Sequence, residues 1–310
     1  MTCKISSVLT SSSLICLIGF FILSCNSAKE EKTVPHIVTT TGMLYDAVLN
    51  ITKGKMTIEA LMGPGVDPHL YKATQGDLQK LNQADLVIYN GLQLEGKMTS
   101  ILEKLSLQKP VANATENFPQ NLLLTASGYQ DAYDPHIWFD VSRWKHAVQA
   151  TSEAIVQLDP SNGDYYNKNT VNYLQKLDSL DGHIEKKLKE IPAAQRILVT
   201  AHDAFNYFGD AYDIQVAALQ GMSTVSDFGL KDIANAIDLI TENNIKAIFA
   251  ETSVSERSIN AVVAGCREKG HDVVLGGSLY SDAMGAYGTE EGTYIGMFKK
   301  NIDTIVKALK

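Results

Sequence analysis

Residues 159–192 read DPSNGDYYNKNTVNYLQKLDSLDGHIEKKLKEIP, and this stretch decides how the chain is organised. It contains no short apolar run of the kind that forms a buried strand. Its apolar side chains recur at intervals of three and four residues, which is the pattern of one helical face. These side chains are Val171, Leu174, Leu177, Leu180, Ile184 and Leu188. Asp159-Pro160 favours a helix start and Ile191-Pro192 a stop, so we predict one long helix over residues 159–192.

On both sides of this helix, strand-like and helix-like patterns alternate along the chain. Short apolar or β-branched runs predict strands at 36–40, 56–62, 86–89, 196–200, 247–250 and 272–275. Helical spacing predicts helices at 73–83, 97–105, 143–158 and 230–242. Such alternation is typical of α/β units with a mainly parallel sheet. We therefore predict two α/β lobes, residues 35–158 and 193–310, joined by the long helix.

The overall composition agrees with this organisation. The chain has 310 residues, of which 45% are hydrophobic and 20% charged, so it is apolar enough to build a core. At about 150 residues per domain, this length favours two lobes. The formal net charge is −8 and there is no basic stripe, which argues against a nucleic-acid partner.

The first 24 residues have the features of a secretory signal. Lys4 supplies a positive charge, and the apolar run at 14–23 is shorter than the roughly 20 residues that span a bilayer. Ile22-Leu23-Ser24-Cys25 resembles the lipobox of bacterial lipoproteins, in which the cysteine is lipidated and becomes the mature N-terminus. The alternative is a plain signal peptide with an incidental cysteine. With a lipid on Cys25, the polar residues 25–34 form a tether between membrane and domain.

This interpretation also accounts for the four cysteines. Cys3 and Cys16 leave with the signal, Cys25 is the anchor, and Cys266 is the one thiol of the mature body. A single thiol cannot form an internal disulfide, so we expect the fold to depend on its apolar core.

Candidate metal ligands stand at predicted strand ends and in proline-containing loops. In open α/β sheets, ligands bind beyond the carboxyl ends of the strands. His69 and His136 each follow an Asp-Pro pair, whose proline restricts the local backbone, while His202 and Asp282 follow predicted strands. Three imidazoles and a carboxylate suit Zn²⁺ and are acceptable to Mn²⁺ or Fe²⁺. Their spacing along the chain does not by itself show that they converge.

A histidine taken singly is more often solvated or hydrogen-bonded than a metal ligand. We apply that structural interpretation to the remaining histidines, which lie in helical segments, a turn or a strand start. They are His36, His146, His183 and His271.

Six segments carry a family resemblance over about residues 35–310. They are GVDPH (65–69), DPHIW (134–138), TAHDAF (200–205), LQG (219–221), FAETS (249–253) and SDAMG (281–285). Together they resemble the metal-binding lipoproteins of bacterial zinc and manganese ABC importers, the TroA-like members of solute-binding protein family 9 (cluster A-I). The resemblance implies metal ligands at His69, His136, His202 and Asp282, with the metal between the lobes. It also implies a rigid interlobe helix and a modest lobe movement on release.

The resemblance bears on the metal as well. Manganese-dedicated members often carry glutamate at the third ligand position, so His202 favours zinc, because imidazole is softer than carboxylate. Many zinc members have a loop rich in histidine and acids before the second histidine, but residues 118–133 hold no histidine and one acid, Asp131. We predict Zn²⁺, with Mn²⁺ or Fe²⁺ as alternatives. Glu251 follows a predicted strand and is placed to hydrogen-bond a ligand imidazole.

The function implied is binding without turnover. Four protein ligands close a zinc site, whereas catalytic zinc keeps a position open for water. We expect an exported monomer, held at the cell envelope by a lipid on Cys25, whose partner is an ABC permease. A secreted zinc-dependent hydrolase is one alternative, but no His-Glu-x-x-His segment or general base beside a ligand supports it. A surface adhesin lipoprotein is the other, and no sequence feature favours it.

Overall fold

The computed structural model describes residues 34–126, 132–225 and 229–310, and residues 34–310 form one structural unit. The predicted signal peptide, Cys25 and most of the predicted tether lie outside the described residues. Within the described part of the chain, no helix is long and apolar enough to cross a membrane. In the same part, Cys266 is a free thiol and is buried, as the cysteine count predicts.

The N-terminal lobe is built on a four-stranded parallel sheet. Its strands are β1 (His36–Thr39), β2 (Thr57–Ala60), β3 (Leu86–Tyr89) and β4 (Val111–Asn113), in the order β2-β1-β3-β4. Ile37 packs with α1 (Gly42–Thr52) and α4 (Val141–Leu158). Its neighbour Val38 packs with α2 (Gln75–Gln83) and α3 (Thr99–Ser106). Both faces are therefore covered, which is why β1 and β3, in the middle of the sheet, carry apolar side chains on both faces.

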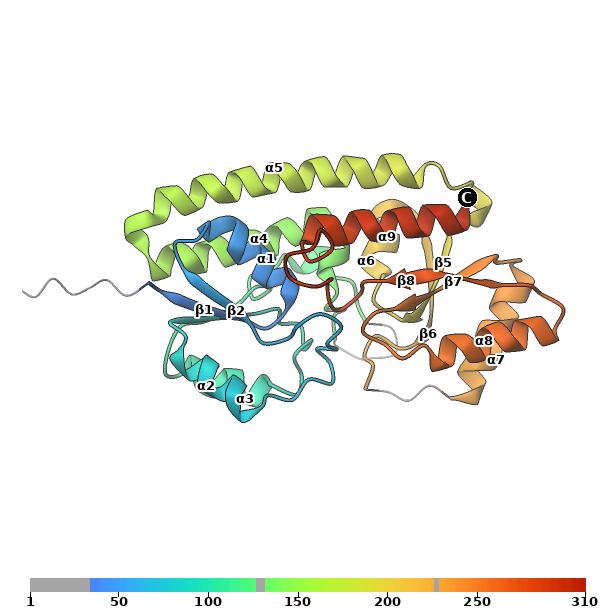
Figure 1. Ribbon diagram of the computed structural model, residues 1–310, viewed down its shortest axis with the longest axis horizontal. Coiled ribbons are helices and arrows are strands. Elements are labelled where there is room, and N and C mark those ends of the chain that lie inside the picture. Colours follow the sequence, from blue (N-terminus) through green and yellow to red (C-terminus); the bar gives the residue numbers. More distant parts are fainter. Residues whose placement is uncertain (1–33, 127–131, 226–228) are drawn as a thin grey trace, which may run out of the picture. The chain divides into compact units, whose positions relative to one another are not determined.

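The C-terminal lobe repeats this arrangement with two strand pairs. β5 (Ile197–His202) pairs with β6 (Gln215–Gln220), and β7 (Ala247–Glu251) with β8 (Val274–Leu279), all parallel; β5 also contacts β7. Leu198 packs in one core with α6 (Asn206–Tyr212) and α9 (Tyr294–Leu309). Val199 packs in another with α7 (Leu230–Glu242) and α8 (Arg257–Glu268). The chain thus has the two α/β lobes that the sequence predicts (Figure 1).

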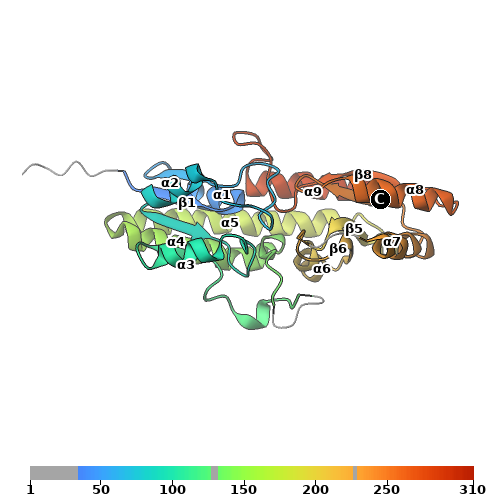
Figure 2. The ribbon, with the colours of Figure 1, turned by 90° about the horizontal axis from the view of Figure 1, so that it is seen from below.

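The long helix α5 (Gly163–Leu188) links the two lobes. It contacts α1 and α4 at one end and α9 at the other, and Figures 1 and 2 show it running beside them. It is shorter than the predicted 159–192 because residues Pro160–Asn162 form a 3₁₀ turn first. Asp159 organises this turn by accepting hydrogen bonds from Ser161, Asn162 and Tyr166. The domain boundaries at 158 and 193 stay a prediction.

All of the predicted strands and helices are present, β3 and α7 with the predicted bounds and the others with shifted ends, but several elements were not predicted. These elements are β4, β6, α1, α6, α8 and α9. β4 has three residues and β6 combines two glutamines with two alanines, so their apolar patterns are too weak to identify them. Pairing with stronger neighbours, β3 and β5, places them in the sheets.

Candidate metal centre

Four side chains that lie far apart in the sequence meet between the lobes. His69 lies in the loop after β2, and His136 stands just before the 3₁₀ helix Ile137–Phe139. His202 is the last residue of β5, and Asp282 follows β8. One ligand atom from each lies within 4.8 Å of the others, and all four residues are buried. The structure thus brings together the four candidate ligands of the sequence analysis.

The distances within this cluster match the spacing of ligands around one small cation. His69 Nε2 lies 3.3 Å from His136 Nε2. The Asp282 carboxylate lies 3.5 Å from His136 Nε2, 3.7 Å from His69 Nε2 and 3.2 Å from His202 Nε2. Tetrahedral zinc with bonds of about 2.0–2.1 Å would hold its ligand atoms about 3.3 Å apart. The site can therefore accept the ion with small adjustments.

The atoms that face the centre are short of hydrogen bonds. His202 Nε2 and both carboxylate oxygens of Asp282 are buried and make no hydrogen bond of good geometry. Leaving buried polar atoms unpaired is costly, and native proteins rarely do so without a functional reason. A cation among these atoms would satisfy all three at once. The cluster consequently has the character of a cation site.

Two of the imidazoles are each held by a buried carboxylate. Asp134 Oδ1 lies 2.7 Å from His136 Nδ1 and also accepts from the His136 backbone N–H at 2.9 Å. Glu251 Oε2 lies 2.5 Å from His202 Nδ1, while its Oε1 accepts from the His202 backbone N–H at 2.8 Å. A proton held on Nδ1 leaves the Nε2 lone pair free for a metal. The hydrogen bond expected of Glu251 is therefore present.

The third imidazole, His69, is held differently. Asp67 Oδ1 accepts from the His69 backbone N–H at 2.8 Å, as in the turn that an aspartate forms with the residue two positions on. Its second oxygen, Oδ2, accepts a hydrogen bond of 2.5 Å from the Thr224 hydroxyl. Asp67 therefore fixes the backbone of His69 and contacts the other lobe.

These surroundings change the pKa values of the three histidines in opposite directions. Burial lowers the pKa of His69 to about 4. Burial acts in the same direction on His136, but the Asp134 carboxylate outweighs it and raises the pKa of His136 to about 9. At His202, burial is outweighed by Asp282 and Glu251, so the pKa lies well above its usual value. In the metal-free protein, the raised pKa values of His136 and His202 therefore favour the protonated, positively charged forms of these two imidazoles.

The candidate acid ligand responds in the complementary way. Burial would raise the pKa of Asp282, but the neighbouring His202 and His136 hold it well below the usual range. Asp282 is therefore ionised and available as a carboxylate ligand.

Aromatic side chains close the inner side of the cluster. Trp138 packs against His136 with ring centroids 5.2 Å apart, and its indole N–H donates to the Ser281 carbonyl at 3.0 Å. Phe139 is buried next to it. Both residues pack around the site, where they would exclude water from a bound ion and so strengthen its coordination.

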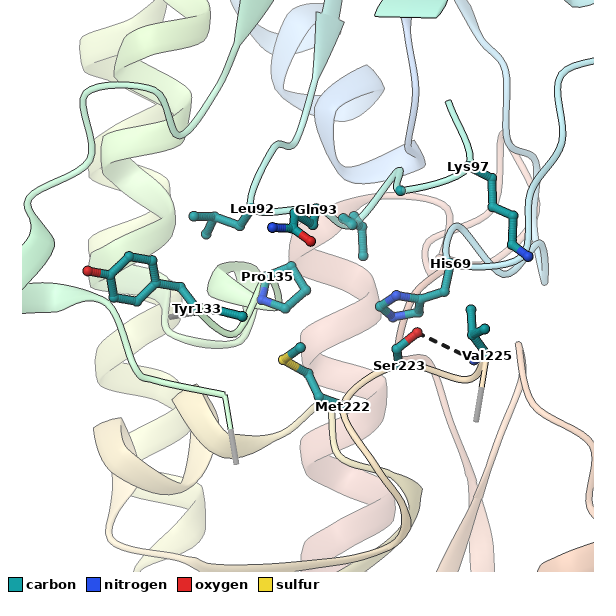
Figure 3. A pocket seen from close by; sticks show the side chains of 12 residues that line it. His69, Leu92, Gln93, Lys97, Tyr133, Pro135, Met222, Ser223 and Val225 are labelled. Atoms are coloured by element: carbon teal, nitrogen blue, oxygen red, sulfur yellow. Dashed lines mark hydrogen bonds between the residues drawn. The ribbon is translucent and has the colours of Figure 1, made fainter. Parts of the chain in front are cut away.

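The outer side opens on a cavity of about 610 Å³. His69 lines it together with Leu92, Lys97, Tyr133 and Met222, and Figure 3 shows its ring among these side chains. His136, His202 and Asp282 are not among the lining residues. The cavity therefore meets the candidate site at His69.

The remaining histidines lie outside the cluster among the described residues, as predicted. His146 and His183 are in helices α4 and α5, and His36 begins β1. His271 Nε2 lies 2.7 Å from the Ile245 carbonyl oxygen.

Sequence reasoning missed the aspartates that position two of the imidazoles. Asp67 and Asp134 each stand two residues before a candidate ligand, where an aspartate side chain reaches the backbone N–H of that ligand. The repeated Asp-Pro-His triplet carries this signal in its aspartate.

Comparison with known proteins agrees with this geometry. The family model described as zinc-uptake complex component A, periplasmic, matches residues 37–308. The chain belongs to this family. Among family relatives, it is 49% identical to the manganese-binding lipoprotein MntA of Bacillus subtilis, over 94% of this chain and 96% of MntA. It is 44% identical to the zinc-binding protein TroA of Treponema pallidum, over 92% of each chain.

The fold is similar to that of a solved member of the family. The structure of periplasmic zinc-binding TroA from Treponema pallidum matches with a TM-score of 0.87 at 44% identity. The match covers 89% of this chain and 99% of that one. The two-lobe α/β fold is therefore the fold of this family.

Proposed function

We propose that this protein captures a divalent metal ion outside the cytoplasm and delivers it to an ABC permease for import. The observation that carries the proposal is the buried cluster of three imidazoles and one carboxylate, in which His202 Nε2 and both Asp282 oxygens face the centre without a hydrogen bond of good geometry. We assign His69, His136, His202 and Asp282 as the ligands, and Glu251 as the residue that orients His202. The metal is the cargo, and the protein performs no reaction on it.

We propose Zn²⁺ as the ion bound most tightly, with Mn²⁺ as the second candidate and Fe²⁺ as the third. Three imidazole ligands favour zinc over manganese, as does the general order of divalent-metal affinities. The manganese alternative is supported by the 49% identity to a relative named as manganese-binding, against 44% to one named as zinc-binding.

We further propose that Cys25 carries a lipid and that residues 25–34 tether the monomeric binding unit to the cell envelope. The lipobox-like sequence before Cys25 supports this, and MntA is named as a lipoprotein. The hydrolase and adhesin alternatives find no support in the family or in these relatives.

The test of the function is metal analysis followed by competition. Protein purified without added metal is analysed for its elements, and Zn²⁺ and Mn²⁺ then compete for the metal-free form. We expect one ion per chain and tighter Zn²⁺ binding. Zinc can win in such an assay by chemical affinity alone, so uptake of both ions by cells with and without the protein identifies the physiological cargo.

A pair of variants links this binding to the assigned site. His202→Ala should weaken metal binding more than the roughly 100-fold that loss of an outer partner can cost, because it removes a ligand. His183→Ala removes an imidazole from α5, away from the cluster, and should leave the dissociation constant unchanged. Equal affinities in the two variants would remove His202 from the site. Titration calorimetry or a fluorescent chelator gives both values.

A further inference from the structure

The two Asp-Pro-His loops have the same local sequence but use their aspartates differently. Asp134 holds both the backbone N–H and the imidazole of His136. Asp67 holds the backbone N–H of His69, but its second oxygen binds the Thr224 hydroxyl, which lies 157 positions away in the sequence. The placement of His69 thus depends on a contact with another part of the fold.

Thr224 belongs to the C-terminal lobe. It follows β6, and its carbonyl accepts a hydrogen bond of 3.0 Å from the side chain of Gln220, the last residue of that strand. Gln220 in turn pairs in register with His202. The Asp67–Thr224 hydrogen bond therefore joins the loop of an N-terminal candidate ligand to a segment placed beside a C-terminal one.

His69 is also the ligand nearest to the open cavity. It is the member of the cluster that lines the cavity, and it is 4% exposed, whereas His136 and His202 are 0% exposed. Met222, Ser223 and Val225, the neighbours of Thr224, line the same cavity, and Figure 3 shows Ser223 and Val225 beside the His69 ring. The hydrogen bond that crosses between the lobes is thus at the edge of the cavity.

We propose that the metal enters and leaves through this cavity on the His69 side, and that the Asp67–Thr224 hydrogen bond sets the exchange rate. When it is intact, it holds the His69 loop against the C-terminal lobe and keeps Nε2 in the cluster. When it breaks, the His69 loop is released from the C-terminal lobe while the other three ligands stay in place. Asp67 and Thr224 are positioning residues, since neither is a member of the cluster. The inference rests on the proposed function.

The size of the effect follows from the type of hydrogen bond. A hydroxyl donating to an ionised carboxylate makes one of the stronger hydrogen bonds in proteins. Loss of such a bond should raise the population of the released loop, and we expect metal dissociation to become about tenfold faster. Replacing Thr224 leaves the Asp67 side chain in place, so the hydrogen bond from the His69 backbone N–H to Asp67 Oδ1 survives.

The test measures Zn²⁺ dissociation by stopped flow, with the loaded protein mixed into an excess of a chromogenic chelator. Thr224→Val keeps the shape of the side chain and removes its hydroxyl, and it should release Zn²⁺ about tenfold faster than wild type. Thr224→Ser restores the hydroxyl and should return the rate toward wild type. Thr241→Val is the matched control, because the Thr241 hydroxyl bonds the Ile237 carbonyl within α7.

Each result has one meaning. If the wild-type protein does not bind Zn²⁺ or Mn²⁺, the proposed function fails. If it binds but Thr224→Val releases Zn²⁺ no faster than Thr241→Val, the proposed role of the Asp67–Thr224 bond is wrong. Rapid release from Thr224→Ser as well would also overturn it, because the hydroxyl would then not be the cause. Equal urea unfolding of the metal-free variants shows that any difference arises in metal exchange.

Discussion

At the scale of single residues, the three candidate imidazoles differ in what holds them. His136 and His202 each have a carboxylate on Nδ1, from Asp134 and Glu251. This contact raises the basicity of the ring and strengthens it as a ligand, but it also strengthens its hold on a proton. Metal binding at this site must therefore displace protons, and it should depend on pH.

We expect the metal affinity to rise with pH up to about pH 9. His69, with a pKa of about 4, is neutral above pH 5 and contributes little to the dependence. His136, with a pKa of about 9, and His202, whose pKa is also raised, are protonated at neutral pH and must lose their protons to bind metal. Each displaced proton should change the affinity by about tenfold per pH unit. Calorimetric titrations from pH 5 to 9 measure the slope.

Glu251→Gln provides the control for this pH dependence. The carboxylate of Glu251 raises the pKa of His202, so removing its charge should move the dependence to lower pH. Glu190→Gln alters a glutamate that is paired with Lys310 and lies outside the cluster. This variant should leave the pH dependence of metal affinity unchanged. An affinity that does not vary with pH in the wild-type protein would contradict a site built from three imidazoles.

At the scale of elements, helix α5 is fastened to both lobes by buried or part-buried hydrogen bonds. The Tyr173 hydroxyl donates to Asp46 of α1 at 2.7 Å, and Asn169 donates to the Ile51 carbonyl at 2.9 Å. On the other lobe, the Tyr212 hydroxyl of α6 donates to Asp181 at 2.6 Å. The helix therefore holds the lobes together by directed contacts in addition to its apolar stripe.

We expect Tyr173→Phe to lower the free energy of unfolding by about 1–3 kcal/mol. Asp46 is buried, which raises its pKa, and the Tyr173 hydroxyl is its side-chain hydrogen-bond partner. Removing the hydroxyl deprives a buried carboxyl group of its side-chain hydrogen bond. Urea unfolding measures the change, and Tyr165→Phe, at a partly exposed position of the same helix, is the control. Equal losses in the two variants would show that the buried hydrogen bond is not the cause.

At the scale of the whole molecule, the two lobes share a continuous core. Phe139 of the N-terminal half packs on Phe205 with ring centroids 4.2 Å apart, and on Phe298 of α9 at 5.9 Å. The same core contains Ile37 of β1 and Leu198 of β5. A shared core opposes large separation of the lobes, and a metal ion held by ligands from both would oppose it further.

Metal removal should therefore lower the thermal stability of the protein. An ion present at about 1,000 times its dissociation constant adds about 4 kcal/mol to the folded state, which corresponds to roughly 10 °C in Tm for a chain of this size. Differential scanning calorimetry with Zn²⁺ and with excess chelator measures the difference. The difference should largely disappear in Asp282→Ala. Its full retention in that variant would place the stabilising ion elsewhere.

What the sequence determined by itself is the alternation of apolar strands and helices, a long helix expected within residues 159–192, and the candidate ligands His69, His136, His202 and Asp282. These come from local periodicity and from motifs of a few residues, which are present in any conformation of the chain. Weak strands such as β4 and β6 were missed, because partners across the sheet place them and their own patterns do not.

Tertiary structure alone decided which partner each candidate ligand has. Glu251 meets His202 across 49 positions, and Asp67 meets Thr224 across 157. The pairing of Asp134 with the His136 ring is local, yet the sequence did not show that Asp67 uses its second oxygen elsewhere. Such contacts depend on how the lobes pack, because a hydrogen bond forms only within about 3 Å and in the right direction.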